Sequence, residues 1–295
     1  MTRLISIAAG GHAPRWHPNP GALREHIRRR VDDADCDLIV FPEYAAMEAA
    51  LIGAPEGDPD PAIWAERGAE AHGDWVRILS AAAREFGAYI LAGSGPVRED
   101  GRLLNRAVLC APTGETAHQD KMIPTPHERN VMEIEGGDGL TLFDTRLGKI
   151  GVLICYDAEF PLYARSLAAA GAEMLLIPSC TDTAAGQTRV RVAARARALE
   201  NQCLVVQAPL MGEVEGCDPV YGNVGRVGFF GPSDFRQPDD GIQAQGRPDD
   251  PRWVRLALDP ADILATRSDG DVETFADWPR QGWPDAPVTI LPIGK

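Results

Sequence analysis

The sequence has no long apolar run, which argues against a protein that crosses a membrane on helices. No run of apolar residues approaches the roughly 18 positions that a membrane-spanning helix needs. The apolar stretch near the start, at residues 4–9, is too short for the hydrophobic part of a signal peptide. We therefore expect a soluble protein of the cytoplasm with no membrane partner.

Positive charge is scarce as well. The chain has 29 Lys and Arg residues against 43 Asp and Glu residues, which gives a formal net charge of −14. Nucleic acids bind proteins largely through Lys and Arg, which displace the counterions of the phosphates. The composition therefore predicts that nucleic acid is not a partner.

Cysteines at the spacing of metal ligands are also missing. The six cysteines form no CxxC motif and no cluster with histidine, and they are too few for a disulfide scaffold; they are Cys36, Cys110, Cys155, Cys180, Cys203 and Cys217. We expect no metal and no other cofactor. Most of these cysteines adjoin apolar runs, where a free cysteine usually acts as a small hydrophobic residue.

Short apolar runs alternate with helical patterns along the 295 residues, and this rhythm predicts a layered α/β domain. The predicted strands are residues 4–8, 37–41, 89–92, 106–110, 149–154, 174–177, 204–207 and 226–230, and the predicted helices are residues 22–33, 61–86, 161–170 and 184–201. The segments DLIVFPEY and MLLIPSCTD resemble each other, which suggests two related halves.

The C-terminal segment differs in composition from the rest. Four prolines and two tryptophans, Trp278 and Trp283, fall within residues 269–295. We interpret residues 1–268 as a single domain and residues 269–295 as an extended tail. The tryptophans suggest that the tail docks on a surface, either of a second subunit or of the same chain.

Reactive side chains follow three of the predicted strands, at the position where open α/β sheets bind their ligands. Glu43 follows an apolar run and a proline, where limited hydration raises the proton affinity of a carboxylate and makes it a usable base. The alternative is an ordinary surface glutamate after a strand.

Cys155 lies on a predicted turn between a strand and a helix. Such a turn pushes a nucleophile forward, and the amide N–H groups after it can face an oxyanion. A thiol reacts as thiolate, so it needs a base or a cation nearby. The alternative is a core cysteine that ends a strand.

The third place is the loop KMIPTPHERN, which two prolines make rigid. It offers the cation of Lys121 and the carboxylate of Glu128. The alternative is a solvated charged loop, and for His127 we prefer it, because no second histidine or cysteine stands near enough for a metal site.

The three segments FPEY, DK…PTPHERN and ICYDAEFP, in this order, strongly resemble the carbon–nitrogen hydrolase (nitrilase) superfamily. The later segments RARALENQCLVVQA and FGPSDF resemble it too, so that the likeness covers roughly residues 4–260. The resemblance implies an α-β-β-α sandwich with mixed sheets, formed by a single domain. It also implies a homodimer or a larger homo-oligomer.

The resemblance further implies roles for particular residues. Cys155 would attack the carbonyl carbon of an amide, Glu43 would take the thiol proton, and Lys121 would hold the oxyanion. Glu128 would orient the lysine or the substrate nitrogen. The candidates for binding the oxyanion or the substrate are Tyr156, through its backbone N–H, with Tyr44, Cys180 and Thr181.

The residues after the nucleophile favour one branch of the superfamily. Nitrilases proper usually carry Trp-Glu there, whereas this chain has Tyr156 and Asp157, as in the branches that act on amides or N-carbamoyl compounds. A small amide is thus the expected substrate. Three alternatives stay open: hydrolysis of a small nitrile, a non-catalytic member that binds a small amide or a protein, and a redox protein that uses Cys155 and Cys180.

Overall fold

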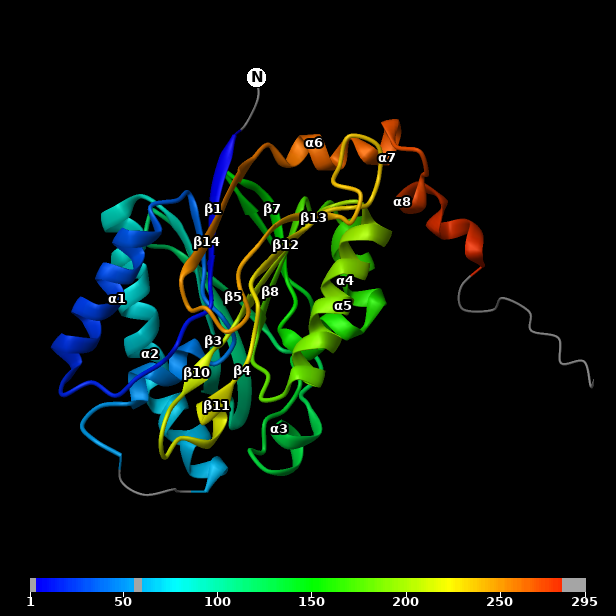
Figure 1. Ribbon diagram of the computed structural model, residues 1–295. Coiled ribbons are helices and arrows are strands. Elements are labelled where there is room, and N and C mark those ends of the chain that lie inside the picture. The colour runs from blue at the N-terminus through cyan, green and yellow to red at the C-terminus, as the bar shows by residue number, and fades with distance from the viewer. Residues whose placement is uncertain (1–3, 56–59, 283–295) are drawn as a thin grey trace, which may run out of the picture.

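The computed structural model describes residues 4–55 and 60–282, in which two six-stranded sheets face each other between two layers of helices (Figure 1). The first sheet has the order β14-β1-β2-β3-β4-β5. Its strands are β1 (Ile5–Gly10), β2 (Leu38–Val40), β3 (Tyr89–Glu99), β4 (Arg102–Cys110), β5 (Thr116–Asp120) and β14 (Trp253–Leu258). Strands β1, β2 and β3 are parallel, and the others are antiparallel to their neighbours.

The second sheet has the order β13-β12-β9-β8-β7-β6 and repeats this layout. Its strands are β6 (Leu142–Thr145), β7 (Gly148–Val152), β8 (Met174–Ser179), β9 (Leu204–Pro209), β12 (Gly228–Phe230) and β13 (Ile242–Gln245). Strands β7, β8 and β9 are parallel. Strands β10 (Gly212–Glu213) and β11 (Gly222–Asn223) form a separate pair. The shared layout agrees with the two related halves that the sequence suggests.

Helices cover the outer face of each sheet. Helices α1 (Pro20–Ala34) and α2 (Pro61–Phe86) lie on the first sheet, and α4 (Pro161–Ala169) and α5 (Ala184–Asn201) lie on the second (Figure 1). The ends of these helices follow from local sequence: the Asp60 carboxylate caps α2 at Ala62 N, and Gly87 ends it in the left-handed region. The predicted α-β-β-α sandwich is confirmed.

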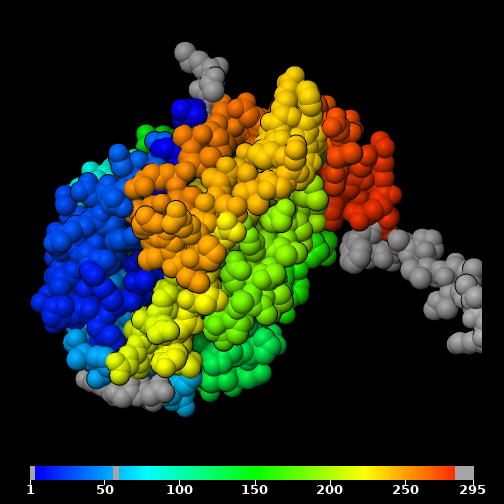
Figure 2. All heavy atoms as spheres, in the orientation of Figure 1, coloured from blue at the N-terminus to red at the C-terminus, as the bar shows by residue number. Residues whose placement is uncertain are grey.

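The core is divided by the first sheet. Alternate residues of β1, β2 and β3, such as Ile7, Val40 and Leu91, point toward the second sheet and share a cluster with Val152 and Leu176. The residues between them pack with α1 and α2 around Trp75. The edge strands β13 and β14 lie side by side, and Figure 2 shows this part of the chain, yellow to orange, between the blue segment of α1 and the green segment of α5.

Several strands were not predicted from the sequence, chiefly β5, β6, β13 and β14. Strand β5 has the sequence TAHQD and is exposed over its first three residues, so it carries no apolar run. Strand β14 (WVRLAL) alternates between more and less exposed residues, a pattern of period two that is typical of an edge strand. In the part of the chain that the structure describes, no helix is both long and apolar enough to cross a membrane.

The beginning of the C-terminal segment is not extended, as far as it is described. Between residues 269 and 282 the chain forms α8 (Thr274–Asp277) and the short 3-10 helix η4 (Trp278–Gln281). The Arg165 guanidinium on α4 lies 4.3 Å from the ring centroid of Phe275 and 4.9 Å from that of Trp278, so these aromatic side chains pack on the domain. Trp283 lies outside the described residues, and the boundary at residue 268 stays a prediction.

A buried carboxylate ties the N-terminal segment to the turn after β2. Glu48 lies in the 3-10 helix η1 (Ala45–Ala50) and is fully buried. Its carboxylate is 2.5 Å from His12 Nε2, 2.7 Å from His17 Nε2 and 3.6 Å from His26 Nε2. Burial raises the pKa of Glu48, but the histidines outweigh it and hold the pKa at about 2. Burial lowers the pKa of His26 to about 4.

We predict that Glu48→Gln lowers the free energy of unfolding by about 3 kcal/mol at pH 7, because it leaves buried imidazoles without their anionic partner. Urea unfolding measures this value. The Glu48 carboxylate is ionised in the folded state at a pH where the unfolded chain binds a proton, so its contribution is lost as the pH falls from about 4.5 toward 2. Glu25→Gln is the control, because Glu25 is exposed and its ion pair with Arg29 is exposed as well. A Glu48→Gln protein as stable as Glu25→Gln contradicts this interpretation.

Candidate active site

Three chain segments bring the predicted reactive groups to one place. Glu43 follows β2, Lys121 directly follows β5, and Cys155 begins the 3-10 helix η2 (Cys155–Glu159) after β7. Their exposed fractions are 1%, 1% and 5%. Glu128, in the short helix α3 (Pro126–Asn130), joins them from the rigid loop. The structure therefore gathers all four residues predicted as catalytic.

The Lys121 ammonium lies between the two glutamates. Its Nζ atom donates to Glu43 Oε1 at 2.7 Å and to Glu128 Oε2 at 2.6 Å. A buried charge is tolerated only when it is paired and hydrogen-bonded, and this bridge meets both conditions. Lysine has three N–H donors, so one remains for another acceptor.

The two glutamates differ in how many hydrogen bonds they accept. Glu128 Oε1 accepts from the Tyr44 hydroxyl at 2.8 Å and from Asn105 Nδ2 at 3.0 Å, and its Oε2 accepts from Lys121 and from Thr125 N. These four donors fill the acceptor positions of a carboxylate. Glu43 accepts from Lys121 and, at 3.1 Å, from Asn105, and both bonds go to Oε1. Its Oε2 takes part in neither.

Both reactive turns contain a residue in the left-handed region. Cys155 has φ of 49° and Tyr44 has φ of 59°, a conformation that is costly for residues other than glycine and is often found at functional sites. The turn of Glu43 also approaches β3 closely: Gly93 has φ of 68°, and a Cβ atom there would lie 2.0 Å from Pro42 O. Only glycine fits at this position.

Asp157 connects the loop that begins at Lys121 to the turn of Cys155. Its carboxylate accepts from the backbone N–H groups of Met122 at 3.1 Å, Ile123 at 2.9 Å and Ile154 at 3.3 Å. Burial raises the pKa of Asp157 to about 6, against the effects of Lys121 and of these donors. In the sequence, Asp157 was a marker of the amidase-like branch, and no structural role was predicted for it.

Burial and neighbouring charges shift the pKa values of the whole group. Burial raises the pKa of Glu43 to about 7, although Lys121 acts against it. Burial, and then the charge of Glu43, raises the pKa of the Cys155 thiol well above its usual range. Burial would lower the pKa of Lys121, but the two glutamates outweigh it and raise it. Burial would raise the pKa of Glu128, but Lys121 outweighs it, so that the pKa is lowered.

The group opens into a cavity of about 320 Å³, whose lining includes Tyr44, Tyr156, Cys180 and Thr181. The Cys155 thiol is 3.6 Å from Cys180 O. The Cys180 thiol itself donates to Asn223 Oδ1 at 2.9 Å. Cys180 is thus part of the pocket wall.

Thr181 and Tyr156 contribute to the wall in different ways. The Thr181 hydroxyl donates to Val224 O at 3.0 Å, so its hydrogen is already used within the protein. The Tyr156 ring packs edge-on against Phe160 at 4.9 Å between centroids. His127 lines the mouth of the cavity, half exposed, with Nε2 3.1 Å from Asp218 Oδ2, as expected for a surface contact.

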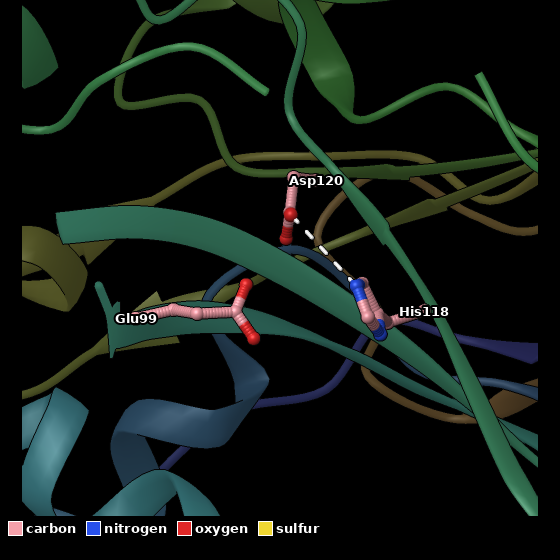
Figure 3. Close-up of side chains that lie close together, drawn as sticks. All are labelled: Glu99, His118 and Asp120. Atoms are coloured by element: carbon pink, nitrogen blue, oxygen red, sulfur yellow. Dashed lines mark ion pairs between the residues drawn. The ribbon is translucent and has the colours of Figure 1, made fainter. Parts of the chain in front are cut away.

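Among the described residues, one group of side chains has the spacing of metal ligands. Glu99, His118 and Asp120 lie close together at the end of β3 and along β5 (Figure 3). Arg106 forms ion pairs with Glu99 at 2.5 Å and with Asp120 at 2.7 Å. The guanidinium therefore supplies the positive charge that these carboxylates need, and we assign no metal to them.

Comparison with known proteins points to one family. The sequence model of the carbon–nitrogen hydrolase family matches residues 7–268. The probable hydrolase YhcX of Bacillus subtilis is 34% identical over 247 residues, which make up 84% of this chain and 48% of that protein. The omega-amidase NIT2-A of Xenopus laevis is 31% identical over 184 residues, or 59% of this chain and 66% of the relative. The matches thus span about half and just under two thirds of these relatives.

Solved structures agree in fold. The amidase of Nesterenkonia AN1, from the nitrilase superfamily, superposes with a TM-score of 0.69 over 94% of this chain and 97% of its own, at 22% identity. At this identity the likeness concerns the fold.

We predict that Asp157→Asn lowers the free energy of unfolding by about 1–3 kcal/mol, because an amide of the same size turns N–H groups toward backbone N–H donors. The loop that begins at Lys121 should then shift relative to the turn of Cys155. Chemical unfolding measures the first effect, and the rate of Cys155 alkylation by iodoacetamide measures the second. Asp37→Asn is the control: Asp37 also accepts a backbone N–H, from Ser6 at 2.8 Å, but outside the site. Equal alkylation rates in the two variants would refute the connection.

Proposed function

The chain belongs to the carbon–nitrogen hydrolase family, and from this premise we propose that it hydrolyses the C–N bond of a small amide or N-carbamoyl compound. The products are an acid and ammonia or an amine, and the reaction passes through a thioester on Cys155. One observation carries the proposal: a buried ammonium pairs with two buried carboxylates in the cavity that holds a thiol.

In the first half of the reaction the thiol of Cys155 attacks the carbonyl carbon of the amide. The thiol proton passes to Glu43, which interacts with the thiol and whose pKa of about 7 suits a base near neutral pH. Glu128 cannot take this part, since its acceptor positions are filled. Oε2 of Glu43 is the atom that receives the proton.

The tetrahedral intermediate carries a negative oxygen. The third N–H of Lys121 and the backbone N–H of Tyr156 bind this oxyanion. Loss of one such donor costs about 10²–10³ in rate in other enzymes. Glu43 returns its proton to the leaving nitrogen, the C–N bond breaks, and a thioester remains on Cys155.

In the second half, Glu43 takes a proton from a water molecule, which attacks the thioester carbonyl. Collapse of this second intermediate breaks the C–S bond and returns the proton to the thiol. The acid is released. These steps use side chains of the cavity, one backbone N–H and water, and they need no cofactor.

The other interpretations have less support. A nitrile could react with the same thiol and base, so the activity assay below includes nitriles as well as amides. The names of relatives such as the omega-amidase favour amides. A disulfide between Cys155 and Cys180 would break the hydrogen bond from the Cys180 thiol to Asn223. We extend the proposal to a homodimer or larger assembly, since Leu162, Val192 and Leu199 expose apolar surface on α4 and α5.

We predict that Cys155→Ala abolishes the release of ammonia from a panel of small amides and simple nitriles, because Cys155 is the thiol that interacts with the base Glu43, whereas the Cys180 thiol donates to Asn223. Ammonia is measured with an enzyme-coupled assay, and mass spectrometry of the wild type stopped during turnover should show an acyl group on Cys155. Cys36→Ala is the control, because Cys36 lies outside the cavity. Ammonia release by Cys155→Ala at the rate of the control would refute the nucleophile.

We predict that kcat/KM falls about tenfold per pH unit below the pKa of Glu43, near 7, because the base must be ionised to accept the thiol proton. Glu43→Gln keeps the size of the side chain but cannot take a proton, so kcat/KM should fall by about 10²–10⁴. Initial rates between pH 5 and pH 9, a range that brackets the Glu43 pKa of about 7, test both points. The control is Glu85→Gln, an exposed partner of Arg28. A Glu43→Gln profile equal to that of the control would exclude Glu43 as the base.

A further inference from the structure

Asn105 is a buried polar residue to which neither the sequence motifs nor the proposed mechanism assigns a part. It lies on β4 in the run LLNRAVLC and is fully buried. Its Nδ2 donates to Glu43 Oε1 at 3.1 Å and to Glu128 Oε1 at 3.0 Å. Its backbone carbonyl accepts from Lys121 N at 2.8 Å. One residue thus contacts three members of the reactive group.

The amide of Asn105 is oriented by the two carboxylates alone. Its Oδ1 is buried and has no hydrogen-bond partner among the described residues. An unpaired buried acceptor is unfavourable, and native proteins seldom retain one without a compensating role. The two bonds of Nδ2 to charged oxygens supply that compensation, since bonds to charged groups are the strong ones.

We propose that Asn105 is a positioning residue that fixes the orientation of Glu43 for its reaction with Cys155. Together with Lys121 it binds Oε1 of Glu43, so that Oε2 is left for the thiol proton. Without the amide, Lys121 would be the remaining donor at Oε1 of Glu43, and the carboxylate could rotate about that bond. The inference rests on the proposed function, because it takes Glu43 as the base.

The charged and titratable groups around Glu43 set the sign of the expected effect. Lys121 lies after β5, Glu128 on α3, Cys155 on η2 and Cys180 after β8, and Tyr44 follows Glu43 in the chain. Only Lys121 among them favours the ionised carboxylate by its charge. Asn105 is a neutral donor whose hydrogen bond also stabilises the ionised carboxylate. Its loss makes Glu43 harder to ionise and moves its titration to higher pH.

The test is the pH dependence of alkylation of Cys155 by iodoacetamide, followed by mass spectrometry. The rate of alkylation should rise with pH through an inflection at the pKa of Glu43. Leucine has nearly the size of asparagine but no donor, so in Asn105→Leu this inflection should move up by about one pH unit. At pH 6 the variant should then react approximately tenfold more slowly than the wild type. Asn105→Ser, a smaller polar replacement that cannot reach both carboxylates, should shift it in the same direction. Glu43→Gln should remove the inflection.

The matched control is Asn201→Leu. Asn201 is also fully buried, also donates through Nδ2, to Arg197 O, and also has an Oδ1 without a partner among the described residues, but it lies at the end of α5. It should lose stability as Asn105→Leu does, and its inflection should stay at the wild-type pH. The proposal is overturned if the Asn105 variants keep the wild-type inflection, or if Asn105→Ser fails to fold while Asn201→Leu folds. Alkylation needs no turnover, so a protein that hydrolyses no amide would refute the proposed function without deciding this test.

Discussion

The pairing of one buried ammonium with two buried carboxylates is the constraint on which the site depends. Glu43 comes from one segment and Lys121 and Glu128 from another, and each is nearly fully removed from water. Any one of them alone would be very unfavourable in this position, because an isolated buried charge keeps little solvation. The fold therefore has to bring the ends of β2 and β5 and the helix α3 to the same point with little freedom. Asp157 serves the same end, since it binds the backbone after Lys121 to the turn of Cys155.

The same pairing distinguishes two residues of identical chemistry. Glu128 accepts four hydrogen bonds and has a lowered pKa, so it remains a fixed negative charge beside Lys121. Glu43 accepts two bonds on a single oxygen, and its pKa is raised to about 7. The carboxylate with fewer donors is the one that can exchange a proton near neutral pH. The difference in role follows from the number of donors that each carboxylate meets, without any difference in residue type.

The sequence allowed the reactive residues to be predicted where a local pattern marked them. Glu43 and Cys155 stand at the ends of apolar strands, and Lys121 stands in a loop that prolines make rigid. Asn105 could not be found in this way, because its partners lie 62 and 23 positions away and only the fold joins them. An isolated asparagine in the apolar run LLNRAVLC was the only sign of it. The fold class followed from the repeated rhythm of strands and helices together with the family likeness, but half-exposed strands such as β5 lacked the apolar run that would have shown them.

The turn that carries Glu43 is also held in place by the buried carboxylate of Glu48. Tyr44 adopts the left-handed conformation and leads directly into η1, where Glu48 binds His12 and His17 of the N-terminal segment. A strained backbone conformation persists only when its surroundings hold it, and here the support comes from both sides of the turn. Toward the cavity, the Tyr44 hydroxyl donates to Glu128. Toward the N-terminal segment, Glu48 pairs with His12 and so anchors η1. The position of Glu43 relative to Cys155 therefore depends on the contacts of Glu48 with the N-terminal segment. A loss of these contacts would displace Glu43 through the backbone of this turn.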